Sequence, residues 1–104
     1  MDDCKIIDLF NERSEKAISA ISRKYGRTSL KIAENILKSK EDAEECVNDA
    51  YLALWNKIPP ERPSPLSSYL FKVVRNISLK RYHKNAAQKR NSFYDKALEE
   101  LENV

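Results

Sequence analysis

The chain has 104 residues, of which 41% are hydrophobic and 34% are charged, and its formal net charge is +3. This composition is typical of one globular domain and excludes a wholly disordered chain. One glycine and four prolines leave long runs suited to helices and few turn residues for hairpins, so the composition predicts an all-α fold.

The sequence has few residues suited to catalysis or metal binding. Cys4, Cys46 and His83 are the only cysteines and histidine, so they cannot supply a four-ligand zinc set, and no metal or other cofactor is expected. No phosphate loop or paired-carboxylate signature is present, which disfavours an enzyme. Two isolated cysteines, with no apolar run that could span a membrane and no signal peptide, predict a cytoplasmic protein.

Two helices are predicted in the first part of the chain. A first helix over about residues 11–25 is indicated by apolar side chains at helical spacing, and Gly26 is expected to end or bend it. A second, short helix is expected to begin at Thr28 or Ser29, whose hydroxyls can cap it, and to end near Lys38.

A third helix is predicted to begin after Ser39. The Ser39 hydroxyl precedes the carboxylate of Asp42 by three residues, which is a variant of the capping box, and acidic residues fill the first turn. One side of this helix is apolar and is expected to pack in the core. Glu45, Asn48, Asp49 and Leu52 lie together on another side. Carboxylates near a helix N-terminus also stabilise the helix, so a purely structural role for them is the simpler interpretation.

A loop and a fourth helix follow. Three prolines within residues 58–63 remove hydrogen-bond donors and favour extended backbone, which predicts a loop. Ser64 and Pro65 are expected to restart a helix that runs to about Asn85. Residues 91–104 are expected to be a linker or a C-terminal helix.

The charged residues of the fourth predicted helix are all basic up to residue 94. From Arg62 to Tyr94 there are eight basic residues and no acidic residue, which is the pattern of a surface that faces a polyanion. A solvated basic surface is the alternative. Asn76 lies among these bases, and an amide can read a base edge, whereas Lys or Arg on phosphate adds affinity without reading sequence.

Two stretches together resemble a known family. Residues 40–55 read KEDAEECVNDAYLALW, and after the loop residues 68–77 read SYLFKVVRNI. This series resembles region 2 of the sigma-70 family of bacterial RNA polymerase sigma factors, and within it the extracytoplasmic-function group. The resemblance covers about residues 11–90 and implies a small bundle of about four helices, with residues 1–10 as an N-terminal lead-in.

The resemblance also implies partners and site residues. The third helix would bind the clamp helices of the β′ subunit of core RNA polymerase through Asp42, Glu45, Asn48, Asp49 and Leu52. The loop and the fourth helix would recognise and melt the minus-ten promoter element and hold a base of the non-template strand outside the stack. The implied DNA-binding residues are Ser68, Tyr69, Lys72, Arg75, Asn76, Lys80, Arg81 and Lys84, with Asn76 at the promoter-reading position. An anti-sigma factor is a further partner that the resemblance allows.

Some features depart from the family pattern. Asn48 stands where glutamine is usual, Tyr69 stands where tryptophan is usual, and the loop is unusually rich in proline. The second domain of the family, a helix-turn-helix that reads the minus-thirty-five element, is expected to be absent from this chain.

Two other functions stay open from the sequence. One is a free-standing basic helical module that binds DNA or RNA, and the other is a helical protein-interaction domain of an enzyme regulator. The acidic side of the third helix argues against the first, because these acids would repel phosphate. A protein-interaction domain of an enzyme regulator would not explain the basic fourth helix.

Overall fold

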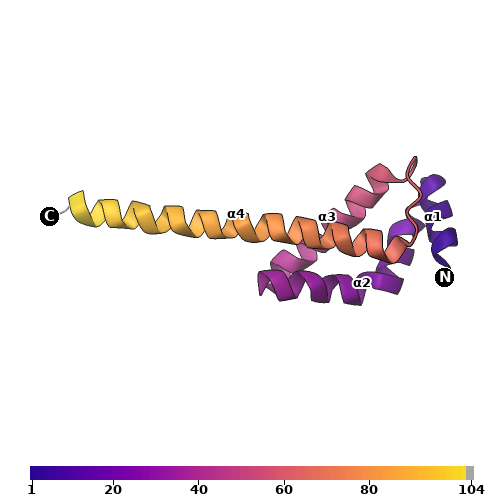
Figure 1. The fold of residues 1–104 in the computed structure, drawn as a ribbon, viewed down its shortest axis with the longest axis horizontal. Helices are drawn as coiled ribbons and strands as arrows, with labels where there is room; N and C mark the ends of the chain where they lie inside the picture. Colours follow the sequence, from indigo (N-terminus) through magenta and orange to yellow (C-terminus); the bar gives the residue numbers. More distant parts are fainter. Residues whose placement is uncertain (103–104) are drawn as a thin grey trace.

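The computed structural model describes residues 1–102, which form four α-helices and no strand (Figure 1). The helices are α1 (Asp3–Asn11), α2 (Lys16–Leu37), α3 (Lys40–Lys57) and α4 (Leu66–Glu102). Helices α2, α3 and α4 pack against one another, and α1 packs against α2. The prediction of an all-α bundle of about four helices is therefore confirmed for the described residues.

The core forms where α2 and α3 meet the first half of α4. Each helix turns an apolar side inward, as the periodicity of the sequence requires. The larger side chains that are almost completely buried are Phe10, Ile6, Ile21, Leu54, Ile58, Leu66, Leu70 and Val74. The side of α3 predicted to pack is buried throughout, and it comprises Ala43, Cys46, Val47, Ala50, Tyr51 and Leu54.

The segment expected to be a lead-in forms α1. Ile6, Ile7 and Phe10 are buried, and their spacing places them on one side of a short helix. The carboxylate of Asp3 fastens this helix to α2, because it accepts hydrogen bonds from Lys24 Nζ at 2.8 Å and from the Tyr25 hydroxyl at 2.7 Å. The N-terminal residues are thus part of the core.

Replacing Asp3 with Asn is expected to lower the free energy of unfolding by about 1 kcal/mol at neutral pH. The hydrogen bond from Lys24, followed by that from Tyr25, lowers the pKa of Asp3 below its ordinary value of 3.8. Because this pKa is lowered in the folded state, the stabilisation is complete above pH 3.8 and is lost as the pH falls through the lowered pKa. Urea unfolding at neutral and acid pH checks this, and an equal difference between the two proteins at both values would contradict it.

Helix α2 is continuous through Gly26, so the predictions that Gly26 ends one helix and that Thr28 or Ser29 begins another are wrong. A Cβ atom at Gly26 would lie 3.3 Å from the hydroxyl oxygen of Tyr51 on α3. The glycine therefore allows a close approach of two helices, at a cost of about 1 kcal/mol to the helix relative to alanine. The predicted end near Lys38 is confirmed, since Lys38 takes the left-handed conformation, with φ at 57°.

Helix α3 begins as predicted. The hydroxyl of Ser39 accepts a hydrogen bond from the backbone N–H of Asp42 at 3.3 Å, which satisfies one of the free donors at the helix N-terminus. The proline-rich segment ends the helix at Lys57, and α4 begins at Leu66.

Helix α4 is longer than expected, because it does not stop near Asn85 but continues to Glu102. Residues 86–90 are two alanines, a glutamine, a lysine and an arginine, all good helix formers, and neither Gly nor Pro interrupts them. The second half of α4 extends away from the bundle (Figure 1), which gives the chain extents of 66 × 23 × 20 Å. The predicted segment 91–104 is helical to residue 102, and its last two residues lie outside the described range. No helix in that range is long and apolar enough to cross a bilayer.

Candidate functional site

Helix α3 presents the five residues proposed from the sequence on one side, which we call the acidic face. It comprises Asp42, Glu45, Asn48, Asp49 and Leu52. The last four are exposed and Asp42 is half-buried. Leu52 is 58% exposed although it is a large apolar residue, and Asp49 forms no ion pair with another described residue. The face is therefore open to a partner at its C-terminal end.

Helix α4 presents a second surface on the side away from its core stripe, which we call the basic face. It comprises Ser68, Lys72, Arg75, Asn76 and Lys80, all exposed. Asn76 and Lys80 line a shallow hollow together with Ile77, Leu79 and His83. The amide of Asn76 lies at the edge of this hollow, where it can donate a hydrogen bond to a planar polar group and accept one from it. The surrounding basic side chains can hold phosphates nearby.

Tyr69 and Lys84 lie at the margins of the basic face. Tyr69 is half-buried, and its hydroxyl donates a hydrogen bond to Glu61 Oε2 at 2.8 Å. Burial and this carboxylate raise the pKa of Tyr69 above its ordinary value of 10.0. Lys84 is exposed further along α4.

Arg81 does not lie with the other proposed DNA-binding residues, because it turns toward α3. Its guanidinium is 3.1 Å from Asp42 Oδ1 and 3.3 Å from Glu45 Oε1. Hydrogen bonding to Glu45, followed by the charge of Asp42, raises the pKa of Arg81. The structure thus brings one basic residue of α4 into contact with two members of the acidic face.

Asn85 is a contact residue that the sequence did not suggest. Its Nδ2 donates to the second carboxylate oxygen, Asp42 Oδ2, at 3.1 Å. Arg81 and Asn85 continue the helical spacing of the buried stripe that runs through Leu70 and Val74. That spacing was the signal in the sequence that these two side chains face α3 rather than solvent.

Replacing Arg81 with Ala is expected to lower the thermal midpoint of unfolding by a few degrees. The substitution leaves the half-buried carboxylate of Asp42 without its cation. The repulsion between this carboxylate and that of Glu45 is then no longer offset by the guanidinium of Arg81. Lys84→Ala is the matched control, because Lys84 is an exposed base on the same helix and should change the midpoint very little. Thermal unfolding followed by circular dichroism measures both, and equal effects would show that the Arg81 ion pairs contribute nothing.

The proline-rich loop between α3 and α4 is fastened at several points. Arg13 donates to the backbone carbonyls of Trp55 at 2.6 Å and Ile58 at 3.0 Å, and its guanidinium carbon lies 3.9 Å from the centre of the Trp55 ring. Arg62 forms an ion pair with Asp8 on α1 at 3.3 Å. The loop therefore has a defined path beside the N-terminal end of the basic face, although Arg13 carried no signal in the sequence.

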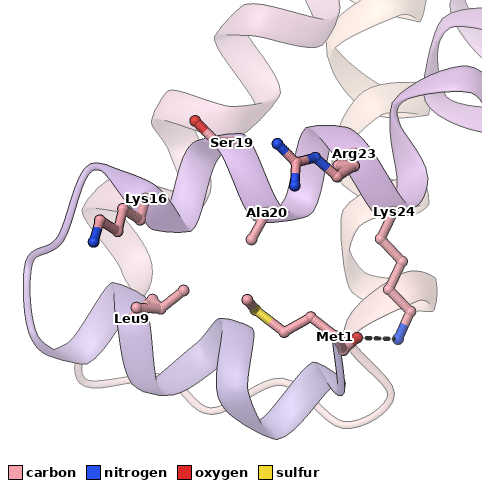
Figure 2. A pocket seen from close by; sticks show the side chains of 7 residues that line it. All are labelled: Met1, Leu9, Lys16, Ser19, Ala20, Arg23 and Lys24. Atoms are coloured by element: carbon pink, nitrogen blue, oxygen red, sulfur yellow. Dashed lines mark hydrogen bonds between the residues drawn. The ribbon is translucent and has the colours of Figure 1, made fainter.

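A separate pocket lies between α1 and α2 (Figure 2). Its wall is formed by Met1, Leu9, Lys16, Ser19, Ala20, Arg23 and Lys24. Lys24 is already engaged, because it donates to the Met1 carbonyl at 3.0 Å and to Asp3. The cavity adds no residue to either the acidic or the basic face.

Comparison with known proteins identifies the family. The family described as Sigma-70 region 2 matches residues 21–88, which include most of α2, all of α3, the loop and the part of α4 that carries the basic face. No characterised protein and no solved structure matches the chain. Since the family match spans well over half of the sequence and both faces lie within it, this chain belongs to the sigma-70 region 2 family, whose members are transcription initiation factor domains that bind RNA polymerase and recognise promoters.

Proposed function

We propose that this chain belongs to the extracytoplasmic-function group and joins core RNA polymerase to the minus-ten promoter element, with one partner on each of its two faces. The observation that carries the proposal is the presence of two exposed surfaces of opposite charge on neighbouring helices, α3 and α4. A protein that only bound nucleic acid would gain nothing from the acidic face, because phosphate is repelled there. As a transcription factor of bacteria, it would work in the cytoplasm.

The acidic face is proposed to bind the clamp helices of the β′ subunit. Leu52 supplies an exposed apolar group at the C-terminal end of the face, and Glu45, Asn48 and Asp49 supply polar groups on the turns before it. Protein interfaces usually combine apolar contacts with polar groups at their rim. The charged groups would also select a basic partner and speed its association.

The basic face is proposed to hold the non-template strand of the minus-ten element. Lys72, Arg75 and Lys80 would contact phosphates, and Ser68 and Lys84 would extend this contact along α4. Asn76 would read a base, because its amide borders a hollow. Tyr69 and the fastened loop would line the site of an extruded base.

Arg81 occupies a special place in this proposal. It belongs to the implied DNA-binding set, yet its guanidinium contacts the carboxylates of Asp42 and Glu45. We propose that it contacts DNA only when those carboxylates are engaged by the polymerase. An anti-sigma factor would act by covering either face.

The test of the proposed function is a titration of labelled single-stranded and duplex minus-ten oligonucleotides with the chain, with and without core polymerase. Alone, the chain should bind weakly, without sequence preference and with strong salt dependence, because the acidic face is uncovered and extruding a base costs a few kcal/mol. With core polymerase, it should bind the single non-template strand selectively. Tight, selective duplex binding by the chain alone would instead favour a free-standing DNA-binding module.

A further inference from the structure

The C-terminal end of α3 lacks a backbone donor that a continuing helix would supply. The carbonyl of Trp55 would then accept a hydrogen bond from the backbone of residue 59, but residue 59 is proline and has no N–H. The guanidinium of Arg13 takes this place, since its Nη1 donates to the Trp55 carbonyl at 2.6 Å and to the Ile58 carbonyl at 3.0 Å. Arg13 therefore caps α3 at the point where the proline-rich loop leaves it.

Arg13 makes this contact from an uncommon backbone conformation. It lies in the turn between α1 and α2, and its φ of 58° is in the left-handed region that few residues other than glycine adopt. The turn is held by backbone hydrogen bonds from Arg13 to Phe10 and from Ser14 to Leu9, both at 3.0 Å. The guanidinium carbon also lies 3.9 Å from the centre of the Trp55 ring. A charged group that donates two hydrogen bonds and stacks on a ring makes a strong and directional contact.

The other attachments of the loop differ in strength and position. Glu61 in the middle of the loop accepts a hydrogen bond from the Tyr69 hydroxyl at 2.8 Å, which ties the loop to the margin of the basic face. Arg62 pairs with Asp8 at 3.3 Å, but both side chains are 58% exposed, so this pair contributes little. The path of the loop toward Tyr69 therefore depends chiefly on Arg13 at its start and on Glu61 further along.

We propose that Arg13 is a positioning residue for promoter recognition, which holds the loop in the path that lines the site of the extruded base. The proposal rests on the proposed function. Arg13 lies outside residues 21–88, which match the family, so this role belongs to the N-terminal segment of the chain. Contact between Arg13 and DNA is not required, because Arg13 acts through the carbonyls of Trp55 and Ile58.

Binding of the single-stranded non-template minus-ten oligonucleotide in the presence of core polymerase tests this role. Arg13→Ala should raise the dissociation constant about tenfold, because the loop would take the binding-competent path in only about a tenth of the molecules. The salt dependence of the affinity should stay unchanged, since no phosphate contact is lost. A salt dependence reduced by about one ion would show instead that Arg13 holds a phosphate, and it would overturn the proposal.

Two further variants separate positioning from stability. Asp3→Asn is the matched control, because Asp3 fastens α1 to α2 without a contact to the loop, and this variant should bind the oligonucleotide like the original chain. Arg13→Lys keeps the charge but loses the planar group that stacks on Trp55 while donating to both carbonyls, so it should also bind more weakly. Arg13→Lys carries the test if Arg13→Ala does not fold. Normal binding by either Arg13 variant, or an equal loss for Asp3→Asn, would overturn the proposal.

The fluorescence of Trp55, the only tryptophan of the chain, reports on the contact without polymerase or DNA. Quenching by acrylamide should increase in Arg13→Ala, because the ring loses the guanidinium that covers one side, and it should stay unchanged in Asp3→Asn. Unchanged quenching in Arg13→Ala would show that the guanidinium does not hold the start of the loop, which would overturn the proposal. A failure of the proposed function looks different, because the original chain would then show no selective binding with core polymerase, and the role of Arg13 would fall with it.

Discussion

Reversing the charge of Glu45 and Asp49 together should lower the affinity of the chain for core RNA polymerase by about 100-fold or more. Both side chains are exposed on the acidic face beside Leu52, where a basic partner would meet them. Introduced lysines would replace attraction by repulsion in that contact. The fold should stay intact, because exposed charges contribute little to stability.

The structure dictates how this experiment is controlled. Glu45 also pairs with Arg81, so its reversal disturbs α4, whereas Asp49 has no such partner among the described residues. Asp49→Lys alone should therefore reproduce most of the loss. Glu44→Lys is the control, because Glu44 is an exposed acid of α3 in a hollow toward α2 with Arg27 and Leu30, and of the acidic face only Asn48 borders that hollow. Co-purification with core polymerase measures binding, and undiminished yield for the double variant would refute the assignment of the acidic face.

The elements predicted correctly are those whose signals are local. The start of α3 follows from the hydroxyl of Ser39 and the acids after it, and the loop follows from its prolines. Both effects depend on neighbouring residues only, so they can be read from the sequence alone.

The incorrect predictions depend on contacts between distant segments. Gly26 suggested a helix end, but its role is to admit the hydroxyl of Tyr51 from α3. The segment before residue 11 is too short to form a stable helix alone, and it is helical because Ile6 and Phe10 are buried in the core. Neither fact could be known without the packing of the chain.

The candidate site divides in the same way. The spacing of the acids along α3 was sufficient to gather the acidic face, because residues three, four and seven apart share a side of a helix. The run of bases along α4 was a weaker guide, since a count of charges ignores direction. Arg81 counted as one of eight bases, yet its position in the spacing of Leu70 and Val74 directs it to Asp42. Arg81 and Lys80 carry the same charge, but their side chains leave different sides of α4.

Replacing Asn76 with Ala should weaken binding of the polymerase complex to the preferred minus-ten sequence by about 1–3 kcal/mol and have little effect on binding to sequences altered at the base it reads. An amide can make two hydrogen bonds to one base edge, and alanine makes none. Asn76 is exposed, so the substitution should not disturb the core. Binding to a panel of single-stranded minus-ten variants, each measured with core polymerase present, gives the base-specific loss.

Lys72→Ala is the comparison that separates reading from holding, because Lys72 lies on the same side of α4, is also exposed and has only a point charge to offer. It should weaken binding to every sequence alike and reduce the dependence of affinity on salt by about one ion. Asn76→Ala should leave that salt dependence unchanged, since it removes no charge. If Asn76→Ala instead weakened all variants equally, the amide would be a contact to the backbone of the strand, and the preference for a promoter sequence would have to come from the loop beside Tyr69.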